Sequence, residues 1–196
     1  MKNTSLISVF LAAFAAVIST GCPKPAPSST CETFDGLPLA QYDTLPPTVS
    51  PPGSVIFSVA GGVPVSIHSV DLGSGPYFNF AGIETAPATF GSGHVVNTNN
   101  VCIEFGFSAG GKTVTEASIE FLDMGGTENL WVNGAAYAGE LVAAPATLGG
   151  ASVTVASTPL PGGKKGKVKV KGSATTPIKA LRIGGQEFYL DNLCYQ

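Results

Sequence analysis

The chain has 196 residues and a formal net charge of −3, and only 12% of its residues are charged. This lack of basic excess gives little reason to expect a nucleic-acid partner. The sequence holds 25 glycines and 15 prolines and no long helix-forming stretch. Such a composition favours strands and turns, and about 175 residues beyond the first 21 are enough for one domain with a hydrophobic core.

The N-terminus has the pattern of an export signal. Lys2 gives it a positive start, and residues 6–18 form an apolar run that small residues and Cys22 follow. The run is too short to span a bilayer as a mature helix. Residues 1–21 are therefore predicted to be a signal peptide, and the rest of the chain to leave the cytoplasm.

Gly21-Cys22 resembles the lipobox of bacterial lipoproteins, although Ser19 stands where that family usually has Leu, Val or Ile. The resemblance implies that Cys22 is lipidated and anchors the protein to the membrane of the cell envelope or to the cell surface. The alternative is an ordinary cleaved signal that leaves Cys22 free for a disulfide. Residues 22–30 are rich in proline and serine and are predicted to be a tether, with one domain at 31–196.

Short runs in which apolar and polar residues alternate fill the rest of the chain, and Gly or Pro separates them. This period of two residues is typical of half-buried strands. The spacing predicts nine to twelve strands and an all-β, antiparallel two-sheet jelly-roll sandwich after the signal helix. The clearest runs are residues 54–59, 63–67, 101–107, 114–121, 129–132, 153–155, 168–170, 180–183 and 186–195.

The four cysteines are spaced too widely for a CxxC metal or redox motif. An exported domain permits disulfides. Cys31 and Cys194 lie on the first and last predicted strands, which often lie side by side in closed sandwiches, so this pair is preferred. Pairing of Cys102 with Cys194 is the main alternative.

Two phrases carry a resemblance to a known family. The chain closes with Gly-Gly-Gln-Glu-Phe-Tyr-Leu-Asp-Asn-Leu at 184–193 and opens with Thr-Phe-Asp-Gly-Leu-Pro at 33–38. Both resemble galactose-binding-like and carbohydrate-binding-module sandwiches, in outline over residues 31–196. The resemblance implies a structural Ca²⁺ bound by Asp35 and Asp191. Alternatively, Asp191 bonds the backbone and Asp35-Gly36 forms a turn.

Other side chains admit both a binding and a structural interpretation. Trp131, beside polar Asn133, is a candidate for stacking on a sugar ring, but a core position is equally open. Strand alternation places it opposite Leu130 and Val132. Lys167, Lys169 and Lys171 share one face of a strand. They fit edge protection, a solvated face, or contact with anionic glycans or lipid headgroups.

Glu104, Glu116 and Glu120 lie opposite the apolar residues of two predicted strands. Two of them could form the acid pair of a glycoside hydrolase, or all three could belong to a solvated face. The leading hypothesis is a non-catalytic binding or structural module of the cell envelope, with a glycan as its most concrete ligand. A glycoside-active hydrolase is the alternative.

Overall fold

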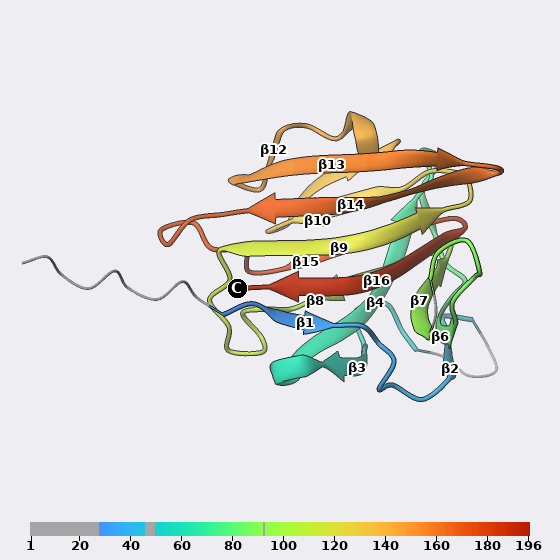
Figure 1. The fold of residues 1–196 in the computed structure, drawn as a ribbon, viewed down its shortest axis with the longest axis horizontal. Helices are drawn as coiled ribbons and strands as arrows, with labels where there is room; N and C mark the ends of the chain where they lie inside the picture. The colour runs from blue at the N-terminus through green and yellow to red at the C-terminus, as the bar shows by residue number, and fades with distance from the viewer. Residues whose placement is uncertain (1–27, 46–49, 92) are drawn as a thin grey trace, which may run out of the picture.

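The computed structural model describes residues 28–45, 50–91 and 93–196, and these form two antiparallel sheets packed as a sandwich (Figure 1). The predicted all-β class is therefore confirmed, as is the two-sheet sandwich. The signal peptide, Cys22 and residues 23–27 of the tether lie outside the described residues. No helix in the described part of the chain is long and apolar enough to cross a membrane.

The first sheet has the order β12-β13-β14-β9-β16-β7-β6-β2, and β1 pairs with the second half of β16. In Figure 1 its central strands cross the front of the molecule. Its strands are β1 (Thr30–Glu32), β2 (Ala40–Asp43), β6 (Phe80–Thr85), β7 (His94–Asn99), β9 (Glu116–Asp123), β12 (Thr147–Leu148), β13 (Ala151–Leu160), β14 (Gly163–Lys171) and β16 (Phe188–Tyr195).

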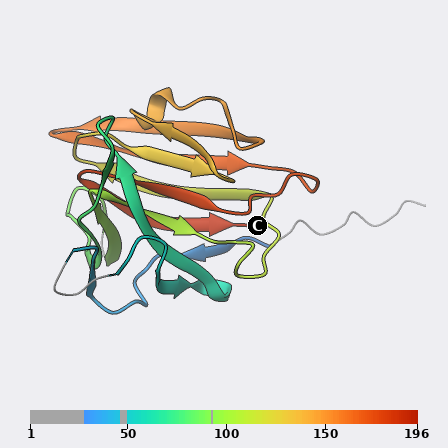
Figure 2. The same ribbon diagram turned by 180° about the vertical axis from the view of Figure 1, so that it is seen from behind.

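The second sheet has the order β11-β10-β15-β8-β4-β3, with β5 paired to β4, and is seen in front in Figure 2. Two short 3₁₀ helices, η1 (Ala60–Gly62) and η2 (Leu141–Ala143), interrupt the strands. The strands of this sheet are β3 (Val55–Val59), β4 (Val63–Asp71), β5 (Pro76–Tyr77), β8 (Val101–Phe105), β10 (Asn129–Val132), β11 (Ala135–Ala138) and β15 (Leu181–Gly185).

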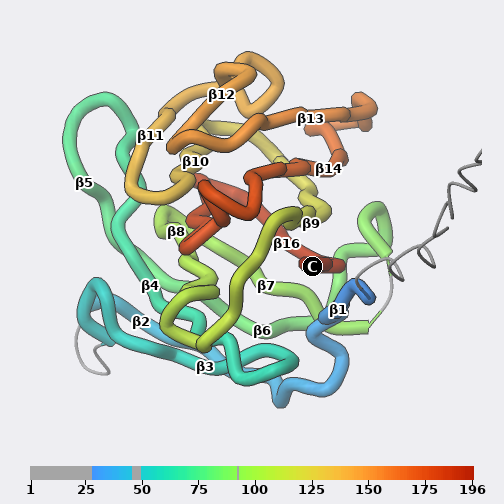
Figure 3. Tube along the Cα trace, turned by 90° about the vertical axis from the view of Figure 1, so that its left-hand side faces the viewer, coloured from blue at the N-terminus to red at the C-terminus, as the bar shows by residue number. Residues whose placement is uncertain are grey.

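The chain passes repeatedly from one sheet to the other, which is consistent with a jelly-roll-like fold. The end-on view in Figure 3 shows the two layers, with the first sheet curling around at its β7-β6-β2 end. There β2 approaches β3, and the rings of Tyr42 and Phe57 lie with their centroids 6.0 Å apart.

The core lies between the inner faces of the two sheets. Along β9 every second side chain points into the core, and Ile119 and Phe121 among them are fully buried. Ile103 on β8 contributes to the same core from the second sheet. Phe121 and Phe188 stack with ring centroids 5.5 Å apart. Alternation therefore fixes which residues remain on the outer faces.

The preferred disulfide is confirmed. Cys31 and Cys194 are direct partners in the pairing of β1 with β16 and are bonded to each other. Cys102 is a free cysteine, and burial raises the pKa of its thiol well above the usual range. The disulfide joins the first and last described strands, which is the geometry that the sequence predicted.

The sequence predicted too few strands. The described residues contain sixteen, against an expected nine to twelve. Two of them, β5 and β12, have only two residues each, and β1 has three. Strands this short form because neighbouring strands supply their hydrogen-bond partners, and they are too short for the alternation to repeat and be detected.

Candidate functional site

A row of paired charges follows the outer face of the first sheet. Lys167 on β14 lies 3.0 Å from Glu120 on β9, and Lys169 lies 2.8 Å from Glu116. The interpretation of these lysines as edge protection is wrong, because β14 lies between β13 and β9 rather than at an edge. Pairing across adjacent strands explains the pattern, because Lys167 directly faces Glu120 and Lys169 reaches Glu116 diagonally across the strand pair.

A pocket of about 350 Å³ opens on this charged face. Half-buried Phe90, from the loop between β6 and β7, contributes an aromatic surface. Charged and hydroxyl groups from β9, β13 and β14 form much of the remaining wall. The lining residues are Phe90, Glu120, Ala156, Ser157, Thr158, Lys165, Gly166 and Lys167. Such a combination of one apolar surface with convergent polar groups is typical of ligand sites.

Asp191 extends the row of acids beyond this pocket. It is the cross-strand partner of Glu120, and the strand pairing is interrupted by a β-bulge just after it. In the bulge Asn192 has a φ of 50°, and its side-chain amide donates to Glu120 Oε2 over 3.0 Å. Asp191 is 8% exposed, and burial, followed by the negative charges of Asp35 and Glu120, raises its pKa to about 6. Its Oδ1 accepts the backbone N–H of Asn192 at 2.6 Å.

Asp35 lies in the turn after β1. Its Oδ1 accepts the backbone N–H of His94 over 2.7 Å, and its Oδ2 accepts the hydroxyl of Thr33. The His94 amide, followed by Thr33, lowers the pKa of Asp35. Gly93 is required here, because it has a φ of +86° and an added Cβ would lie 1.8 Å from Asp35 Oδ1. The local structure thus fixes Asp35 against β7.

Asp191 accepts a backbone amide and Asp35-Gly36 lies in a turn, as the alternative interpretation expected, and Asp35 also accepts a backbone amide. They lie near enough for Asp35 to influence the pKa of Asp191. Among the described residues, the group of three or more potential metal ligands includes neither of them. Calcium binding by Asp35 and Asp191 remains a prediction.

Trp131 lies on the outer face of the second sheet. It is half-buried, whereas Leu130 and Val132 are fully buried, as strand alternation predicted. The guanidinium carbon of Arg182 lies 5.0 Å from the centre of the Trp131 ring, a cation–π contact. Glu104 accepts two hydrogen bonds from Arg182, at 3.0 and 2.7 Å. This arrangement covers one face of the indole.

The three glutamates considered for hydrolysis are not brought together. Glu104 is on β8 of the second sheet, whereas Glu116 and Glu120 are on β9 of the first. Glu116 and Glu120 are four positions apart along the strand, which corresponds to roughly 13 Å. Paired carboxylates of glycosidases lie at most about 9.5 Å apart. Each of the three instead forms an ion pair.

Phe90 is the main site residue that sequence reasoning missed. It is an isolated aromatic in a segment rich in Pro, Ala and Gly, and such a loop has no periodicity that would fix its direction. Its place over β9 and β14 depends on sheet order, which the sequence did not predict.

Comparison of the chain with family models, curated proteins and solved structures finds no match.

Proposed function

We propose that this protein is an exported, lipid-anchored β-sandwich that binds a glycan without acting on it. The pocket on the outer face of the first sheet carries the proposal. A sugar ring has apolar C–H faces that stack on an aromatic side chain and hydroxyl groups that bond polar ones. Phe90 supplies the first kind of contact, and Glu120 and Thr158 supply the second.

Two lysines line the pocket, against one acid. Glu120 already pairs with Lys167, whereas Lys165 adds a further positive charge. This charge favours a glycan with carboxylate groups, such as one containing uronic acids. We assign the aromatic contact to Phe90 rather than Trp131, because the Arg182 guanidinium covers one face of the indole.

Binding of the full-length protein to an array of acidic and neutral glycans tests this proposal. We expect retention of acidic glycans at low salt, weakened about tenfold or more by Phe90→Ala. Tyr77→Ala is the matched control, because Tyr77 is an exposed aromatic on β5 of the other sheet, outside the pocket. Equal losses in both variants, or no glycan bound by the wild type, would contradict the proposal.

A reducing-sugar assay on each retained glycan separates binding from hydrolysis. Binding without turnover supports a binding module. Turnover would favour the hydrolase, for which the adjacent carboxyl groups of Glu120 and Asp191 are the first to substitute, given the raised pKa of Asp191.

Export and anchoring are tested by the mass of the protein recovered from the membrane fraction. We expect a chain that begins at Cys22 and carries lipid. A recovered chain that begins there without lipid would remove the anchor from the proposal and leave glycan binding untouched.

A further inference from the structure

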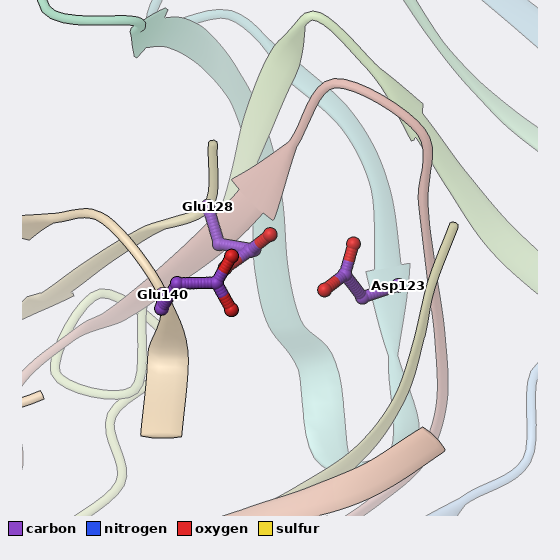
Figure 4. Close-up of side chains that lie close together, drawn as sticks. All are labelled: Asp123, Glu128 and Glu140. Atoms are coloured by element: carbon purple, nitrogen blue, oxygen red, sulfur yellow. The ribbon is translucent and has the colours of Figure 1, made fainter. Parts of the chain in front are cut away.

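Three carboxylates from different parts of the fold meet at the end of β9. Asp123 closes β9, Glu128 lies just before β10, and Glu140 lies between β11 and η2. One oxygen of each lies within 4.8 Å of the other two. Figure 4 shows the three side chains turned toward one another. Because β9 belongs to the first sheet and β10 to the second, the group lies where the two sheets are linked.

The backbone holds the two inner carboxylates in place. Asp123 is 3% exposed and Glu128 is 1% exposed. Asp123 Oδ1 accepts the N–H of Gly125 over 2.8 Å, and Glu128 Oε2 accepts the N–H of Leu141 over 3.2 Å. These bonds use one oxygen of each carboxyl group.

Glu128 Oε1 is the informative atom. It is buried and has no hydrogen-bond partner among the described residues. A buried carboxylate oxygen without a donor is unfavourable, since it has lost water and gained nothing in exchange. Burial, followed by the negative charge of Asp123, raises the pKa of Glu128 to about 8. The buried Glu128 carboxylate therefore lacks enough positive charge around it to offset its burial.

Lys164 supplies only part of that charge. Its ammonium contacts Asp123 Oδ2 at 2.9 Å and also contacts Glu140 Oε2. Burial opposes the charged form of Lys164, but hydrogen bonds to Glu140 and Asp123 outweigh it and raise the pKa. This one ammonium pairs with Asp123 and Glu140, and the ion pairs of the described residues include none to Glu128.

We propose that Asp123, Glu128 and Glu140 bind a divalent cation, with Ca²⁺ the best match. Ca²⁺ prefers hard oxygen ligands, tolerates irregular geometry and accepts several carboxylates, whereas Mg²⁺ usually retains most of its water. The group contains no His or Cys, so zinc is a poor match. The cation binds Glu128 Oε1, releases to solvent the proton that this carboxyl holds at neutral pH, and displaces the ammonium of Lys164.

The surface position of Glu140 makes entry feasible. Its side chain is 57% exposed, so water can reach the cluster and complete the coordination of the ion. The Lys164 side chain is itself 19% exposed and lies beside Glu140, so its ammonium can turn outward. A bound ion would then link β9 of the first sheet to the segments that flank β10 and β11 of the second.

Calorimetric titration and thermal melting of the full-length protein, first freed of metal with a chelator, test the site. We expect CaCl₂ to bind at one ion per chain and to raise the melting temperature by several degrees, with MgCl₂ weaker. Glu128→Gln and Glu140→Gln should each weaken calcium binding about tenfold or more. Glu116→Gln, on the same strand but outside the cluster, is the matched control and should bind as the wild type does.

The outcomes are decisive in both directions. No calcium effect on the wild type, or wild-type affinity in Glu128→Gln and Glu140→Gln, would overturn the proposal. A calcium effect that survives in those variants but disappears in Asp191→Asn would place the ion elsewhere and overturn it too. If Glu128→Gln does not fold, calcium binding by Glu140→Gln decides the test, because the Glu140 side chain is exposed and its substitution should not prevent folding.

Lys164→Met tests the displacement step. It removes the ammonium that competes with the ion, so calcium should bind at least as tightly as in the wild type. Loss of calcium binding in this variant would show that Lys164 organises the carboxylates rather than competes, and would overturn the displacement.

Discussion

Two different kinds of link hold the sandwich together near the two ends of β9. Near the first residues of β9, Ser118 faces Cys194 on the neighbouring strand β16, and the disulfide joins β16 there to β1. At its last residue, Asp123 enters a cluster of three carboxylates and one lysine. The first link is covalent and is broken only by reduction. The second consists of charges, so pH and cations can change it. The strand β9 thus lies beside a covalent link between its neighbours at one end and takes part in an adjustable link at the other.

The largest expected effect is at the covalent end. The double variant Cys31→Ser, Cys194→Ser should lower the free energy of unfolding by about 4 kcal/mol, since the disulfide spans 163 residues and restricts the unfolded chain. Urea denaturation measures this loss. The loss in unfolding free energy should be the same with and without calcium. A strong dependence on calcium would contradict the separation of the covalent link from the charged one.

At the charged end, Lys164→Met should cost about 3 kcal/mol in metal-free protein, because it leaves mostly buried carboxylates without a counter-charge. The Lys164 side chain is 19% exposed and the Asp123 side chain 4%. Lys169→Met is the control. Lys169 forms the same kind of pair with Glu116, but its side chain is 50% exposed, and the loss should stay below about 1 kcal/mol. Equal losses in urea denaturation would mean that burial does not distinguish the two sites.

The pH dependence of stability should reveal Glu128. Burial raises its pKa from an ordinary value near 4.5 to about 8 in the folded protein. Between these values the folded state holds a proton that the unfolded state has released. The free energy of unfolding of metal-free protein should therefore fall as pH rises through this window.

The window from about pH 6 to 8 isolates this effect, because Asp191, with a pKa of about 6, contributes mainly below it. We expect a loss on the order of 2 kcal/mol there, abolished by Glu128→Gln and retained in Glu116→Gln. A flat profile in the wild type, by urea denaturation at each pH, would show that Glu128 is not the group responsible.

The sequence predicted one end of β9 and not the other. Cys31 and Cys194 could be paired because closure of a sandwich brings its first and last strands together, a property of the fold class. Glu128 and Glu140 meet Asp123 only because the β10–β11 hairpin folds back toward the end of β9. No spacing along the chain encodes that contact. Similarly, alternation predicted that Trp131 points away from Leu130, but not that Arg182 would cover its ring.

The smallest effect should come from the exposed pair between the two ends. Lys167 and Glu120 are 48% and 36% exposed, so water and salt screen their attraction. A double-mutant cycle with Lys167→Gln and Glu120→Gln should give a coupling of about 0.5 kcal/mol or less, decreasing further at high salt. Because both residues line the pocket, the same variants should alter the retention of acidic glycans more than they alter stability. A coupling of several kcal/mol would instead make this pair a structural link, like the cluster at the end of β9.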